Sequence, residues 1–119
     1  MLFRSSDENL KFLYAWRQAE GKAGKYNPFN TNKKLKNSTS FNEVGVQNYE
    51  NAQDGLEATI KTLLNGRYAC IVNGLRNDIG ARQIANCESL KTWGTGDLVK
   101  KVVDGYENGA DVKIEPLGP

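Results

Sequence analysis

Glu20 carries the carboxyl group that is best placed in this sequence to do acid–base chemistry. It ends a stretch with helical spacing that contains Phe12, Tyr14 and Trp16, and it directly precedes Gly21. A carboxyl group at the point where an apolar helix gives way to a polar loop can have one dry side and one side open to a ligand. Desolvation disfavours the charged form, so we expect a raised pKa and a proton available near neutral pH. Cleavage of a glycosidic bond requires an acid of this kind.

Polar and aromatic side chains after this acid could recognise a ligand. Asn27, Asn30 and Thr31 lie in an Asn-rich segment, where they could form an Asx-type turn that orders the chain. Gln47 and Tyr49 lie on a predicted strand edge. Amide groups suit sugar hydroxyls and acetamides, and aromatic faces suit sugar rings. Tyr49 could equally pack in the core beneath this strand.

Trp93 lies in a glycine-rich segment at residues 92–96. It could serve as a stacking platform for a ligand, or it could plug the bottom of a helical bundle, and we favour the plug. Arg67 and Tyr68 follow a glycine and are expected to be structural, with Tyr68 touching a cleft at most.

A second catalytic carboxylate is harder to identify. Asp54 fits a helix cap and Glu50 fits a surface acid before that helix, whereas Glu43 lies in a predicted β segment where a catalytic partner could sit. Glycosidases normally use two carboxylates on opposite sides of the bond. Because no partner stands out, a mechanism with Glu20 as the single carboxylate is favoured, and Glu43 stays open as the alternative.

The composition excludes several kinds of site. The chain has no histidine, which excludes Ser-His and Cys-His nucleophiles and His-containing metal sites. Cys70 and Cys87 fall within helical patterns, so we expect buried small apolar residues rather than a disulfide. We therefore expect no metal and no organic cofactor. A hydrolase built from this chain must use carboxylates.

Charge and hydropathy limit the partners. The formal net charge of +2 is too small to predict nucleic-acid binding. No apolar run is long enough to cross a bilayer, and the polar N-terminus predicts no signal peptide. Five lysines after Glu20 indicate either a solvated loop or attraction to an anionic polymer such as cell-wall material: Lys22, Lys25, Lys33, Lys34 and Lys36.

The elements that must position these residues are mainly helical. The length of 119 residues predicts one domain. Ser5 and Glu8 have the spacing of a capping box, which predicts a first helix that ends near Glu20. Residues 22–50 lack helical periodicity, and extended pieces at 39–41 and 44–49 predict a small hairpin.

Helical periodicity returns after residue 50. Asn51 and Asp54 resemble a cap, and the following stripes predict helices near 51–65, 68–77, 79–87 and 97–109, with Leu56, Ile60, Leu63 and Leu64 on the first stripe. Thr95 or Asp97 would cap the last of these helices. Residues 110–119 form a loose tail in which Val112 and Ile114 alternate. The sum is an α+β fold of about five helices with one small β insertion after the first.

Several short segments of this sequence, taken in their order along the chain, resemble parts of one protein superfamily. Ala-Glu-Gly at 19–21, followed by Asn-Pro-Phe-Asn-Thr at 27–31, resembles the catalytic stretch of phage and bacterial lysozyme-like cell-wall hydrolases. The segments 41–49, 65–68 and 93–96 are similar to later parts of such domains. The resemblance covers roughly residues 8–97.

The resemblance implies a lysozyme-like domain that cleaves the glycan strands of peptidoglycan. Glu20 would protonate the glycosidic oxygen. The β insertion and the Trp93 loop would form opposite walls of a groove that binds the glycan through Asn27, Asn30, Thr31, Gln47 and Tyr49. Lytic transglycosylases of this superfamily use a single Glu as acid and then as base. N-acetylmuramidase, N-acetylglucosaminidase and lytic transglycosylase outcomes all stay open.

The resemblance also implies a phage source, a place in the virion or in the host cytoplasm before release, and other virion proteins as partners. A second hypothesis is a lysozyme-like module with little or no activity, which serves as a phage structural or wall-binding component. A third is a small DNA-binding helical domain, which only the loop lysines favour.

Overall fold

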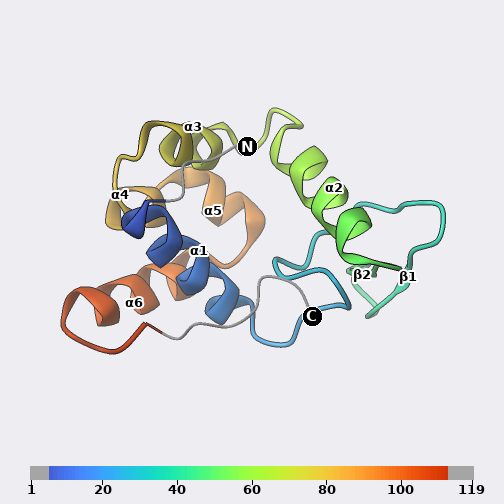
Figure 1. Cartoon of the computed structure of the whole chain (residues 1–119), viewed down its shortest axis with the longest axis horizontal. Helices are drawn as coiled ribbons and strands as arrows, with labels where there is room; N and C mark the ends of the chain where they lie inside the picture. Colours follow the sequence, from blue (N-terminus) through green and yellow to red (C-terminus); the bar gives the residue numbers. More distant parts are fainter. Residues whose placement is uncertain (1–5, 113–119) are drawn as a thin grey trace.

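A computed structural model describes residues 6–112, and this part of the chain is mainly helical with one small antiparallel sheet (Figure 1). This confirms the α+β class predicted from the sequence. The helices are α1 (Asp7–Glu20), α2 (Ala52–Leu63), α3 (Ala69–Asn77), α4 (Ala81–Ala85), α5 (Glu88–Trp93) and α6 (Gly96–Glu107), and the strands are β1 (Thr39–Ser40) and β2 (Gln47–Asn48). None of the helices in this range has the length and apolarity needed to span a membrane.

Helix α1 carries the candidate acid on its last residue. Ser6 caps its start, because the Ser6 side chain accepts a hydrogen bond of 3.0 Å from the Asn9 backbone N–H. The expected capping residue, Ser5, lies outside the described residues, as does Ile114 of the tail. Gly21 ends the helix with a φ of 66°, a conformation that residues with a side chain rarely adopt. The helix therefore ends at Glu20, as the sequence predicts.

The core surrounds α1. Helix α1 packs against α4 and α6, and Phe12, Ala15 and Trp16 are fully buried on it. We call residues 21–38, between α1 and β1, the polar loop. The Trp16 ring stacks on Phe29 of this loop with ring centres 4.2 Å apart, and the Trp93 ring meets the Trp16 ring edge-on at 5.0 Å. Aromatic contacts thus tie the polar loop and α5 to α1.

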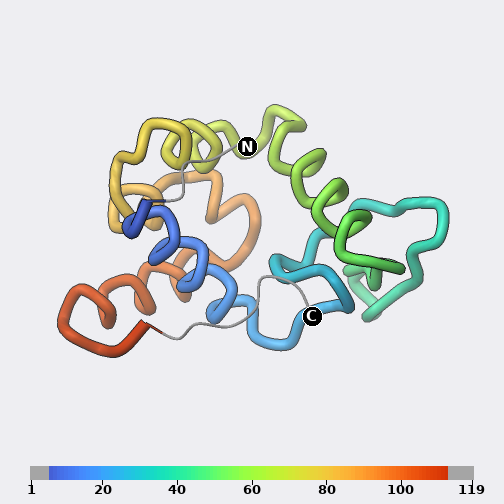
Figure 2. The backbone as a smooth tube through the Cα atoms, viewed as in Figure 1, coloured from blue at the N-terminus to red at the C-terminus, as the bar shows by residue number. Residues whose placement is uncertain are grey.

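The molecule has two sides. Helices α1 and α3–α6 gather on one side, and α2 with the hairpin lies on the other (Figure 2). The predicted hairpin is confirmed, with Thr39 paired to Asn48 and Ser40 to Gln47. The predicted cap of α2 is also confirmed, because Asn51 Oδ1 accepts a bond of 2.8 Å from the Asp54 backbone N–H.

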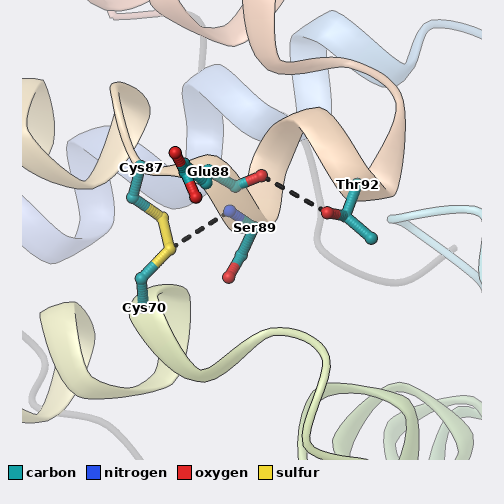
Figure 3. Close-up of a disulfide and its surroundings, with 5 residues drawn as sticks. All are labelled: Cys70, Cys87, Glu88, Ser89 and Thr92. Atoms are coloured by element: carbon teal, nitrogen blue, oxygen red, sulfur yellow. Dashed lines mark hydrogen bonds between the residues drawn. A yellow bond between two sulfur atoms is a disulfide. The ribbon is translucent and has the colours of Figure 1, made fainter.

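Cys70 and Cys87 form a disulfide, so the expectation of two separate buried thiols is wrong (Figure 3). Cys70 lies in the first turn of α3, and Cys87 directly precedes α5. Helices α3 and α5 pack together, which brings the two Cα atoms to 6.1 Å, a separation that a disulfide spans. The Ser89 backbone N–H donates a bond of 3.2 Å to Cys70 Sγ.

Other details of the helices also differ from prediction. The described residues contain six helices rather than about five, because α5 has only six residues and is too short to show a period. Trp93 ends that helix instead of lying in a loop. On α2, Leu56 and Leu64 are exposed, because Gly55, Ala58, Thr59 and Leu63 form its buried face.

Candidate active site

The Glu20 carboxyl group accepts hydrogen bonds from three parts of the chain. Its Oε1 atom accepts a bond of 3.2 Å from Asn30 Nδ2 in the polar loop. Its Oε2 atom accepts a bond of 2.9 Å from Thr95 Oγ1, between α5 and α6, and one of 3.3 Å from Trp16 Nε1 on α1. All three donors are neutral groups, so they orient the carboxyl without a salt bridge.

Burial raises the pKa of Glu20 above its ordinary value of 4.5. The hydrogen bonds from Thr95, Asn30 and Trp16 oppose this rise because they stabilise the charged form, and the positive charge of Arg17 also opposes it. Desolvation is the larger effect, so the net shift is upward, in the direction that the sequence predicts. Such a carboxyl group can keep its proton at a pH where an exposed glutamate has lost it.

Asn30 fixes the carboxyl from the loop side. Its φ is 56°, a left-handed conformation in which asparagine is enriched. Its Oδ1 atom accepts a bond of 3.0 Å from the Gly24 backbone N–H, and its Nδ2 atom donates to the Lys22 carbonyl at 3.1 Å as well as to Glu20. The Asn30 side chain is therefore held by backbone groups while it contacts the acid.

A cleft of about 470 Å³ lies beside this acid, and we call it the polar cleft. This volume is in the range of small-ligand sites. The polar loop, the link from α2 to α3 and the end of α5 form its walls. It is lined by Asn30, Thr31, Asn32, Lys33, Lys61, Thr62, Asn65, Arg67, Tyr68, Thr92 and Trp93. Glu20 is not one of the described lining residues, but its carboxyl contacts Asn30, which lines the cleft.

Three of the predicted site residues line the polar cleft. Asn30 and Thr31 come from the loop, and the Thr31 hydroxyl shares a hydrogen bond of 2.6 Å with the Thr62 hydroxyl of α2. Trp93 is half-buried, and its Nε1 donates a bond of 3.0 Å to the Phe29 carbonyl. Its ring packs edge-on against Trp16 in the core and also borders the cleft.

The other three predicted residues lie behind the cleft wall. Asn27 is buried, donating to the carbonyls of Thr31 and Gln47 at 2.9 and 2.8 Å. The buried Gln47 side chain donates to the Gly45 carbonyl at 2.9 Å. The Tyr49 hydroxyl donates to the Lys33 carbonyl at 2.5 Å, and burial raises its pKa to about 12. The Asn27 and Tyr49 side chains hold the loop that carries Asn30 and Thr31, the Gln47 side chain holds the hairpin turn, and none of the three lines the polar cleft.

The other candidate carboxylates are not part of this cleft. Glu43 is exposed and borders a separate recess beside the hairpin. Glu50 is exposed and accepts a bond of 2.8 Å from Asn37 Nδ2. Asp54 lies in the capped first turn of α2. None of the described residues that line the polar cleft is acidic. Within residues 6–112, no group of three or more His, Cys, Asp or Glu residues could hold a metal ion.

Sequence reasoning missed two of the three groups that donate hydrogen bonds to the Glu20 carboxyl. Trp16 and Glu20 are four residues apart, the spacing at which helical side chains meet, so this contact could have been predicted. Thr95 was expected as a helix cap. It does precede α6, but its side chain caps no backbone N–H there and bonds Glu20 instead. No local pattern reveals a partner 75 residues away.

The site therefore combines a half-buried carboxyl group of raised pKa with an adjoining cleft rich in amide, hydroxyl and cationic groups. A carboxyl group that holds its proton beside a polar cleft is a candidate general acid. Comparisons with models of known protein families, with curated proteins and with solved structures find no match to this chain.

Proposed function

We propose that this chain is a lysozyme-like domain that cleaves the glycan strands of peptidoglycan, with Glu20 as the general acid. The observation that carries the proposal is the Glu20 carboxyl, whose pKa is raised by burial at the edge of the polar cleft. The ordered motifs around residues 19–21 and 27–31 support the same assignment by resemblance. A carboxyl group protonated near neutral pH is what a glycosidic leaving group requires.

The two carboxyl oxygens have different roles in this proposal. Oε1 contacts Asn30, which lines the cleft, so Oε1 delivers the proton to the glycosidic oxygen. Oε2 is held by Thr95 and Trp16. When the proton leaves, these neutral donors stabilise the carboxylate that forms. Burial raises the Glu20 pKa and the hydrogen bonds oppose that rise, so the same surroundings favour holding the proton and stabilise the carboxylate after its release.

A single-carboxylate route agrees best with the composition of the cleft. In the part of the chain that the structure describes, no lining residue is acidic, and Glu43 borders a different recess. Glu20 then first protonates the glycosidic oxygen as its bond to C1 breaks. The Glu20 carboxylate afterwards accepts the proton of the sugar's own C6 hydroxyl, whose oxygen bonds C1 and closes an anhydro ring, as in lytic transglycosylases. Mass spectrometry of the released fragments should show anhydro-sugar ends. Reducing ends would instead mean hydrolysis and would require a second group to activate water.

The direct test replaces Glu20 by glutamine, which keeps the size and removes the acid. We expect Glu20→Gln to lower the rate of clearing of purified cell walls by about 100- to 10,000-fold, the usual contribution of a general acid. Glu43→Gln is the matched control, and we expect it to keep full activity. Equal clearing by the unaltered protein and Glu20→Gln would remove Glu20 from the mechanism.

One observation favours the second hypothesis, a non-catalytic module that binds the wall or serves in a phage particle. Both Glu20 oxygens accept bonds from within the chain, so the carboxyl also joins α1 to the polar loop and to the start of α6. On this hypothesis the protein sediments with insoluble peptidoglycan and releases no fragments. Release of fragments that depends on Glu20 would exclude it.

A further inference from the structure

The polar cleft is positively charged. Lys33, Lys61 and Arg67 line it, and among residues 6–112 no Asp or Glu does. The three cations come from different segments, namely the polar loop, the last turn of α2 and the link from α2 to α3. They therefore converge on one cavity only because the chain folds. The remaining donors in the lining are amides and hydroxyls: Asn30, Thr31, Asn32, Thr62, Asn65, Tyr68 and Thr92.

The cationic side chains of the polar cleft can bind a ligand. Lys61 forms an exposed ion pair with Glu57 at 3.6 Å, a contact of small energy that a better partner can replace. The Arg67 guanidinium lies over the Tyr68 ring, 5.8 Å from its centre, with the side chain exposed. Arg17, whose positive charge lowers the Glu20 pKa, is not among the described lining residues.

We propose that the polar cleft recognises carboxylate groups on the saccharide and not the sugar rings alone. A neutral glycan needs amides, hydroxyls and an aromatic face, whereas three cations without a carboxylate suit an anionic ligand. This inference rests on the proposed function, since it identifies which groups of the glycan the same site reads. The carboxylates could belong to the lactyl ether of the sugar or to an attached peptide.

A binding experiment with Glu20→Gln as the host tests this without turnover. Three probes are compared by calorimetry: neutral chitotetraose, a peptide-free tetrasaccharide of alternating N-acetylglucosamine and N-acetylmuramic acid, and the same tetrasaccharide with its peptides. We expect one or both anionic probes to bind about tenfold more tightly than chitotetraose, with the difference shrinking as salt is added. Preference for the peptide-free form identifies the lactyl carboxylate, and preference for the other form identifies the peptide.

Single substitutions then locate the effect. Arg67→Gln and Lys33→Gln should each remove about three- to fivefold of the preference, with a smaller loss for chitotetraose than for the anionic probes. Lys101→Gln, which removes an exposed cation of α6 outside the cleft, is the matched control and should change nothing. Equal affinity for all three probes, or equal losses in the control, would overturn the inference. Tighter binding of duplex DNA that depends on Arg67 would also overturn it.

The outcomes separate this inference from the proposed function. Charge-selective binding by a protein that never cleaves cell walls would retain the cleft as an anionic saccharide site and remove the catalytic proposal. Cleavage of cell walls by a protein that binds neutral and anionic probes equally would retain catalysis and remove the inference.

Discussion

Thr95 affects the pKa of Glu20 although the two residues lie 75 positions apart in the sequence. Its hydroxyl donates to Glu20 Oε2 at 2.9 Å and is the strongest of the contacts that lower the Glu20 pKa. The threonine side chain is therefore engaged by the carboxyl rather than by the N–H groups at the start of α6. A residue that would be read locally as a helix cap becomes part of the candidate site.

Thr95→Val should raise the Glu20 pKa further, because valine has nearly the same shape and donates no hydrogen bond. In the proposed mechanism the protonated form is active first, so the alkaline limb of the pH–activity profile should move to higher pH. Thr39→Val, at an exposed threonine of β1, is the control. An unchanged profile in Thr95→Val would mean that this hydroxyl does not act on the acid.

The approach of α2 to the polar loop depends on Gly55. A Cβ atom added there would overlap the Tyr26 carbonyl oxygen, which belongs to the backbone and cannot swing away. In an exposed helix interior, alanine is normally more stable than glycine by about 1 kcal/mol. At this position the packing of loop on helix reverses that preference.

Gly55→Ala should lower the free energy of unfolding by about 1–3 kcal/mol, the usual cost of overpacking. Gly105→Ala in α6 is the matched control, because its added Cβ meets nothing within 4 Å. It should raise the free energy of unfolding by up to about 1 kcal/mol. Chemical denaturation of both variants measures the contrast, and a stabilised Gly55→Ala would show that the loop can retreat from α2.

The disulfide is a second link between elements. It closes a loop of 17 residues and fixes the start of α3 to the start of α5, the helix that ends in Trp93 (Figure 3). The double variant Cys70→Ser with Cys87→Ser should lose about 3 kcal/mol of unfolding free energy, from the added freedom of the unfolded chain. Reductant should destabilise the unaltered protein by a similar amount. A melting temperature that reductant leaves unchanged would mean that the bridge is not formed in solution.

At the scale of the whole molecule, the raised pKa of Glu20 makes stability depend on pH. The folded state holds a proton that the unfolded state releases near its ordinary value of 4.5. Stability should therefore fall as pH rises from that value through the raised folded pKa, and change no further above it. Glu20→Gln removes this titration.

The unfolding free energy of Glu20→Gln relative to the unaltered protein should thus increase across this pH window. Denaturation at a series of pH values from about 4 to 8 measures it. A difference that is constant with pH would contradict the raised pKa. A trend of equal size in Glu43→Gln, which removes an exposed carboxyl, would assign the effect to general charge.

The local sequence determined the elements whose signals lie within a few residues of each other. The end of α1 at Glu20, the Asn51 cap and the hairpin at 39–49 all depend on such signals, and so does the raised pKa of an acid at the border of an apolar helix. Helix α5 was not predicted, because its six residues make less than two turns and show no clear period.

Only the tertiary structure decided which distant groups meet. The pairing of Cys70 with Cys87, the bond from Thr95 to Glu20 and the meeting of Lys33, Lys61 and Arg67 in one cleft join segments that are far apart in the chain. Each of these contacts depends on how the helices pack, because the packing of buried faces decides which surfaces lie next to each other. The residues that meet in this way show no periodic pattern in the sequence that would predict the contact. The sequence by itself therefore predicted a candidate acid with a raised pKa, and the fold supplied its hydrogen-bond partners and the cleft beside it.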